Sequence, residues 1–178
     1  MDIMIDIETL SKRNNAVIVS VGAVLFNPRN GGLGESIYIA LDWHQQIMQR
    51  RHISKKTLKW WDEQKEDAPQ GSGKVGMLFG KLATLFEVSS EVIYVWFRGP
   101  DFDKVKLEHL ARQFGHKVPW TYKQVRDSRT LDIFGVKRER SEPTHNALDD
   151  AKEQALDVIY ILDRVRDVGL PAGPPLPA

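Results

Sequence analysis

Residues 1–10, MDIMIDIETL, decide the fold of this chain, because an apolar run passes directly into alternating acidic residues. Side chains alternate along a strand, so a strand over residues 2–7 would point Ile5 and Ile7 to one face and Asp6 and Glu8 to the other. Two bare carboxylates about 4 Å apart repel by about 4 kcal/mol at an effective dielectric of roughly 20. The pair therefore predicts a proton, a basic partner or a cation between them, unless it is only a solvated strand end.

The composition is that of a globular domain without thiol chemistry. The chain has 178 residues, of which 42% are hydrophobic and 28% charged, so we expect one domain over residues 1–168 and a disordered Pro/Gly-rich tail over 169–178. Because there is no cysteine, disulfides and thiolate ligands are excluded, and any metal must be held by Asp, Glu or His. The absence of a long apolar segment and of a secretory signal predicts a cytoplasmic protein that does not bind membranes.

The hydrophobic patterns predict an α/β domain with a mixed sheet and helices packed on it. Three consecutive strands form an antiparallel meander, a buried strand and a short strand or loop follow, and helices occupy most of the remainder. The expected strands are 2–7, 16–26, 36–41, 91–97 and 124–126, and the expected helices are 54–66, 74–87, 102–114 and the segment that follows an Asn146 N-cap, with a helical turn at 130–134.

Two further carboxylates lie where the sites of α/β proteins gather. Asp103 follows the buried strand at its carboxyl end, and Asp150 lies in the first turn of the last helix. Each has a structural alternative, because acidic residues are favoured at helix amino termini. We assign that structural role to Asp101, as N-cap, and to Asp149.

One histidine has a suitable position for proton transfer. His145 lies in the loop before the last helix, five residues ahead of Asp150, and an imidazole exchanges protons near neutral pH. In this order, the acidic residues and the histidine resemble the motifs of the DEDDh branch of the DnaQ-like 3′-5′ exonucleases. The residues that carry this resemblance are Asp6, Glu8, Asp103, His145 and Asp150.

The resemblance implies a ribonuclease H-like fold, with a mixed five-stranded sheet flanked by helices. Residues 6–10, 15–22 and 57–64 look most like the small exoribonuclease-like group with mycobacterial and phage members. One departure is Arg98-Gly99, which stands where many members of the family place Asn shortly before the second-motif Asp. Whether Arg98 contacts a phosphate or only lies at the surface is open.

The resemblance also implies metal-dependent hydrolysis. Asp6, Glu8 and Asp150 would hold one divalent cation, Asp6 would bridge to a second about 3.5 to 4 Å away, and Asp103 would complete the site. Hard oxygen ligands select Mg²⁺ or Mn²⁺. His145 would remove the proton from the attacking water, so that a nucleoside 5′-monophosphate leaves the 3′ end.

Substrate contacts are predicted from basic and aromatic residues around these motifs. The segment between Ile47 and Trp60 carries five cationic side chains and no carboxylate, next to two tryptophans that can stack on bases. These contacts have structural alternatives. One tryptophan would lie in the core, the lysines would form a solvated face, and Leu10, which follows the first motif, would lie in the core. The expected contacts are Trp60 and Trp61 with bases, Lys55 and Lys59 with phosphates, Leu10 with the terminal base and Thr9 with the 3′-hydroxyl.

The expected partner is single-stranded RNA or DNA, or a 3′ overhang, and the group resemblance makes a homodimer plausible. A catalytically weak nucleic-acid binding module of the same fold is one alternative, which the presence of all five catalytic positions disfavours. A ribonuclease H-like endonuclease is another, and the spacing of His145 to Asp150 disfavours it.

Overall fold

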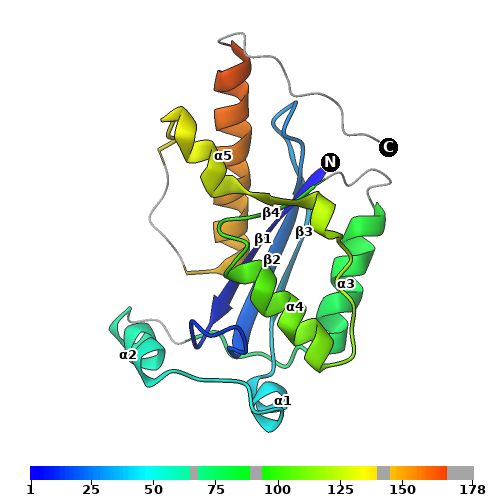
Figure 1. Ribbon diagram of the computed structural model, residues 1–178, viewed down its shortest axis with the longest axis vertical. Helices are drawn as coiled ribbons and strands as arrows, with labels where there is room; N and C mark the ends of the chain where they lie inside the picture. Colours follow the sequence, from blue (N-terminus) through cyan, green and yellow to red (C-terminus); the bar gives the residue numbers. More distant parts are fainter. Residues whose placement is uncertain (65–67, 89–93, 140–144, 168–178) are drawn as a thin grey trace.

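A mixed five-stranded sheet lies between two layers of helices in the computed structural model, which describes residues 1–64, 68–88, 94–139 and 145–167 (Figure 1). The order of the strands is β3-β2-β1-β4-β5. The first three strands pair antiparallel, which confirms the predicted meander, and β4 and β5 join β1 in parallel. The strands are β1 (Asp2–Thr9), β2 (Ile18–Phe26), β3 (Leu33–Ala40), β4 (Val95–Phe97) and β5 (Val125–Asp127).

The helices follow the predicted positions, with two short additions, α1 and the 3-10 helix η1. A short α1 was not predicted, because its six residues give little periodic signal, and it begins where the Asp42 side chain accepts a hydrogen bond from the His44 N–H at 2.9 Å. The tail at 169–178 and part of the predicted strand at 91–97 lie outside the described residues. The helices are α1 (Trp43–Met48), α2 (Lys55–Glu63), α3 (Val75–Val88), α4 (Asp103–Gln113) and α5 (Ala147–Asp167), with 3-10 helices η1 (Tyr122–Gln124) and η2 (Ser128–Phe134).

The alternation of β1 builds the two sides of the core. Ile3, Ile5 and Ile7 pack with buried residues of α3 and α4 on one face of the sheet. Met4 points to the other face, where it packs with Ala151 and other small residues of α5. Asp6 and Glu8 share the face of Met4, so β1 presents its carboxylates on the side of α5. None of the helices in the described part combines the length and apolarity that a bilayer crossing requires.

A small third cluster attaches α2 to the end of the sheet. Leu10, Val17 and Trp61 are buried together there, and the Trp61 indole N–H donates to the Thr9 carbonyl at 3.5 Å. Figure 1 shows α2, the carboxyl end of β1 and the start of α5 at the same end of the molecule. The region that the sequence marked as basic and aromatic therefore lies beside the acidic end of β1.

Gly22 lets α5 approach the sheet closely. It pairs with Asp6 across β1 and β2, and a Cβ added there would lie 2.3 Å from the backbone carbonyl carbon of Ala147, the first residue of α5. Only glycine fits at this contact. The Asn146 side chain accepts hydrogen bonds from the Leu148 and Asp149 N–H groups at 3.0 and 3.3 Å, which confirms it as the cap of α5.

Candidate active site

Three carboxylates from two elements meet at the end of β1. Asp6 and Glu8 come from β1, and Asp150 comes from the first turn of α5, which the contact at Gly22 holds against the sheet. One oxygen of each of the three carboxylates lies within 4.8 Å of the other two, a separation that a shared cation can bridge. All three side chains are partly buried. The sequence motifs thus converge in space.

Asp103 approaches the same cluster from α4. The chain turns after β4 at Gly99, which has a φ of 97°, a backbone conformation that glycine adopts without steric strain. The Gly99 N–H donates to Asp127 Oδ1 at 3.1 Å. Asp103 is the first residue of α4 and is 5% exposed. The predicted N-cap role of Asp101 is wrong: the residue before the helix is Phe102, which makes no side-chain cap hydrogen bond.

Burial and mutual repulsion make these carboxyl groups hard to ionise. Desolvation, with repulsion from Asp150, raises the pKa of Asp6 to about 7 although Gln154 donates a hydrogen bond to it. Desolvation and the neighbouring Asp6, Asp150 and Asp103 raise the pKa of Glu8 to about 9. For Asp103, desolvation and Asp6 raise the pKa to about 8, against the attraction of cationic neighbours. The cluster needs positive charge to be ionised at neutral pH.

Two cationic side chains lie near Asp103. Lys106 and Arg129 both favour the ionised form of Asp103. Lys106 is 1% exposed, donates to the Phe102 carbonyl at 3.3 Å and lies 3.0 Å from the centre of the Phe102 ring. Burial lowers the pKa of Lys106 to about 8. Neither cation is among the groups that stabilise ionised Glu8, so the repulsion at Glu8 stays uncompensated.

Gln154 orients one of the clustered carboxylates. Its side-chain amide donates to Asp6 Oδ1 at 2.8 Å, from a position one turn after Asp150 on α5. Its own carbonyl oxygen is buried without a hydrogen-bond partner among the described residues. The sequence did not single out Gln154, although a glutamine one turn after a candidate ligand on a helix that faces the site is a usable signal.

His145 lies beside the two tryptophans of α2. The centre of its ring is 4.8 Å from that of Trp60 and 6.2 Å from that of Trp61, both in edge-to-face orientation. Its backbone has a φ of 49°, in the left-handed region that only a few non-glycine residues occupy. The histidine thus occupies a defined place between α2 and the start of α5.

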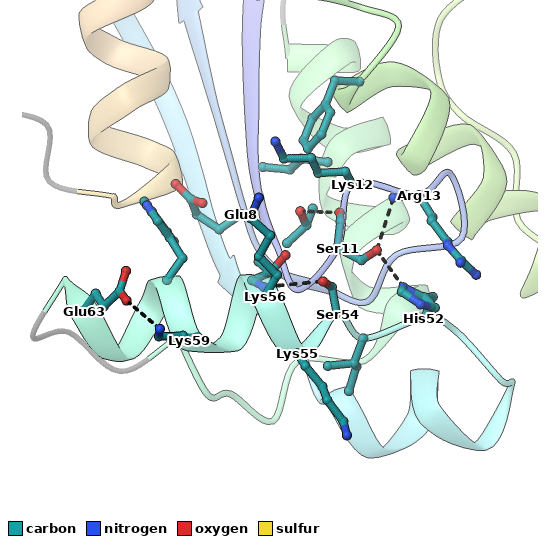
Figure 2. Close-up of a pocket in the computed structure, with 16 residues that line it drawn as sticks. Glu8, Ser11, Lys12, Arg13, His52, Ser54, Lys55, Lys56, Lys59 and Glu63 are labelled. Carbon is teal, nitrogen blue, oxygen red and sulfur yellow. Dashed lines mark hydrogen bonds and ion pairs between the residues drawn. The ribbon is translucent and has the colours of Figure 1, made fainter.

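A groove of about 1060 Å³ begins at Glu8 and runs along α2. Its lining includes Glu8 and Thr9 at one side and several basic residues of the β1–β2 loop and α2. Figure 2 shows Lys12 and Lys56 extending toward the side of the groove that Glu8 lines, whereas Lys55 extends away from it. Within the described residues, neither Lys12 nor Lys56 has an ion-pair partner. The groove is therefore suited to a polyanion that ends at the carboxylates.

Hydrogen bonds fix the loop that carries Lys12. Ser11 is buried, and its hydroxyl lies 2.7 Å from His52 Nδ1 and accepts from the Arg13 N–H at 3.2 Å (Figure 2). The Thr9 hydroxyl donates to the Ser11 carbonyl at 3.0 Å. These bonds hold the end of β1 and the segment before α2 in one arrangement.

The residues predicted to contact the substrate lie in three different parts of the structure. The groove is lined by Thr9, Trp60, Lys55 and Lys59, and Lys59 also forms an ion pair with Glu63 at 3.6 Å. Leu10 and Trp61 are 0% and 2% exposed in the third cluster, where they support the groove from beneath. Arg98 lies 3.7 Å from Asp132 in a different pocket, which shares no residue with the groove.

Comparison with known proteins agrees with this geometry. The family model of the 3′-5′ exoribonuclease Rv2179c-like domain matches residues 1–162. Among curated proteins, no sequence matches the chain. Exonuclease X, solved in complex with 5′-overhanging duplex DNA, superposes with a TM-score of 0.53 at 14% sequence identity, over 92% of each chain. A full-length 3′-exonuclease superposes with a TM-score of 0.51 at 15% identity, over 94% of this chain and 81% of the other. These likenesses confirm the predicted fold class.

Proposed function

Because the chain belongs to the family of 3′-5′ exoribonuclease Rv2179c-like domains, we propose that it removes 5′-mononucleotides from the 3′ end of single-stranded RNA or DNA, or of a 3′ overhang. The observation that carries this proposal is the cluster of Asp6, Glu8 and Asp150, whose carboxylate oxygens lie within 4.8 Å of one another. The raised pKa values of Asp6 and Glu8 mean that the cluster is ionised at neutral pH only with a cation beside it.

The donor set fits two divalent cations of the Mg²⁺ or Mn²⁺ type, because all the ligands are hard carboxylate oxygens. Asp6, Glu8 and Asp150 would hold one ion, and Asp6 and Asp103 would take part in holding the second. When bound, the ions supply Lewis-acid stabilisation of the phosphodiester and of the departing oxygen. Gln154 keeps Asp6 in the orientation that faces Asp150.

The remaining steps belong to residues around the cluster. His145 takes the proton of the water that attacks the terminal phosphodiester in line. Thr9, at the end of β1 and at the wall of the groove, holds the 3′-hydroxyl, and Leu10 beneath it closes this end of the site. The upstream strand lies in the groove, where Lys12, Lys56 and the predicted Lys55 and Lys59 attract its phosphates without reading sequence.

Product sizing tests this function. RNA and DNA oligonucleotides labelled at the 5′ end are incubated with the protein and Mg²⁺, Mn²⁺ or EDTA, and we expect a ladder of products shortened one nucleotide at a time only with the metal ions. A 3′-phosphate should slow digestion, because it displaces the hydroxyl from Thr9. Asp6→Asn is the inactive control.

Two results would overturn the assignment in different ways. Cleavage of a covalently closed single-stranded circle, lost in Asp6→Asn, would show an endonuclease that uses the same carboxylates. Binding of single strands without turnover under any divalent cation would show a catalytically weak binding module. The homodimer that the resemblance implies is tested separately by sedimentation of the purified protein.

A further inference from the structure

Trp60 contacts both the groove and the histidine. Its side chain is 37% exposed and lines the groove together with Glu8, while the centre of its ring lies 4.8 Å from that of His145. One part of the indole thus faces the space for the substrate, and another part supports the imidazole. A residue that only stacked on a base would have no need of the second contact.

Trp61 makes this arrangement rigid. The centres of the two indole rings are 5.1 Å apart at an interplanar angle of 75°, and Trp61 is 2% exposed in the third cluster, which also contains Leu10. Its N–H donates to the carbonyl of Thr9, the last residue of β1. The three rings therefore form a continuous connection from the strand that carries Asp6 and Glu8 to His145. We call Trp60, Trp61 and His145 the aromatic triad.

The backbone conformation of His145 requires support from the surrounding residues. With a φ of 49°, the residue is in a conformation that costs free energy unless its surroundings hold it there. The next residue, Asn146, is fixed as the cap of α5, so the backbone just after His145 cannot relax freely. The described contacts of the imidazole ring are with Trp60 and Trp61. The orientation of the imidazole depends on these two indole rings.

We propose that Trp60 is a positioning residue for His145, which it holds in place for proton transfer at the carboxylate cluster. The proposal rests on the exonuclease function proposed above. It differs from a role in base stacking in its kinetic consequence. Loss of stacking weakens substrate binding and raises KM, whereas loss of positioning lowers kcat and leaves KM nearly unchanged.

A double-mutant cycle tests the proposal. We expect Trp60→Ala to lower kcat about tenfold, which corresponds to about 1.4 kcal/mol and lies within the range of an aromatic contact that orients a catalytic group. Trp60→Phe should restore most of kcat, because a phenyl ring can keep an edge-to-face contact. In a His145→Ala background, Trp60→Ala should lower kcat no further, since the group that it positions is absent. Equal losses of kcat in both backgrounds, or a rise in KM alone, would overturn the proposal.

The control variant comes from the same helix. Leu58 is also 37% exposed on α2 but is not among the described residues that line the groove. Leu58→Ala should leave kcat and KM unchanged, and a loss of kcat equal to that of Trp60→Ala would assign the effect to the stability of α2 and overturn the proposal.

A second measurement does not depend on activity. The indole rings should shift the NMR signal of the His145 ring away from that of an exposed histidine, and the signal is assigned by its disappearance in His145→Ala. Trp60→Ala should move this signal toward the exposed value, whereas an unchanged signal would show that the contact is absent in solution. If Trp60→Ala moves the His145 signal but the wild type shows no nuclease activity, the proposed function is wrong, whereas the contact between Trp60 and His145 is confirmed.

Discussion

The substitution Asp6→Asn should stabilise the metal-free protein while it removes activity. Asp6 is partly buried beside Asp150, and desolvation, together with repulsion from Asp150, raises the pKa of Asp6 from 3.8 to about 7. Asparagine has nearly the same shape, and its side-chain oxygen can still accept the hydrogen bond that Gln154 donates at 2.8 Å. The change thus removes a charge without removing a contact.

The magnitude follows from the difference between the folded and unfolded pKa values. The folded state binds a proton that the unfolded chain releases above about pH 4, so the metal-free wild type loses stability as pH rises toward the folded pKa of about 7. A difference of about three pKa units at about 1.4 kcal/mol each sets an upper limit of about 4 kcal/mol. Because Asp6 is only partly buried, water reduces both the desolvation cost and the repulsion from Asp150, and we expect a gain of about 2 kcal/mol.

Urea denaturation at pH 4, 7 and 8 in EDTA measures this gain. Asp6→Asn should be more stable than the wild type at pH 8 and about equally stable at pH 4. Added Mg²⁺ should stabilise the wild type and have a much smaller effect on the variant. Asp163→Asn removes the same charge from an exposed position of α5 and should change little. A variant that is less stable than the wild type at pH 8 without metal would refute the electrostatic account of the cluster.

Three other substitutions test separate parts of the site. His145→Ala should lower kcat by about 10² to 10⁴ with Mg²⁺-induced stabilisation retained, and an undiminished rate would exclude His145 as general base. Gly22→Ala should cost about 1 to 3 kcal/mol of stability in urea and most of the activity, because its Cβ would lie 2.3 Å from the backbone at the start of α5. The double change Lys12→Glu and Lys56→Glu should weaken binding of single strands and flatten its salt dependence, whereas Lys81→Glu on α3 should not; equal binding by both variants would remove the groove lysines from the interface.

The sequence is sufficient to predict the strands and the members of the carboxylate cluster, for a local reason. The alternation of β1 is imposed by the geometry of an extended chain, so Asp6 and Glu8 had to share a face. The helix that begins after Asn146 was marked by its cap and its apolar stripe, which placed Asp150 in the first turn. Only the meeting of these two elements needed the family motifs, because it depends on how α5 packs on the sheet.

Contacts between distant elements could not be predicted in the same way. Lys106 is an ordinary lysine in the pattern of α4, and only packing shows that it is 1% exposed beside Phe102. Leu10 was predicted either to contact a terminal base or to lie in the core, and only packing shows that it is 0% exposed in the third cluster. Lys12 was not singled out, because the course of the β1–β2 loop depends on the contact between Ser11 and His52, 41 residues apart.

A cation at this site would also be part of what holds the fold together. β1 carries Asp6 and α5 carries Asp150, and the contact at Gly22 forces the two elements together. Without positive charge, ionisation of Asp6 beside Asp150 opposes the packing of α5 on the sheet, because desolvation and this repulsion raise the pKa of Asp6 to about 7. With a cation bound, the same carboxylates would hold the start of α5, and the adjacent His145, against β1. Metal binding and the packing of α5 are therefore coupled, and a substitution that loosens the start of α5, such as Gly22→Ala, should lower the apparent affinity for Mg²⁺.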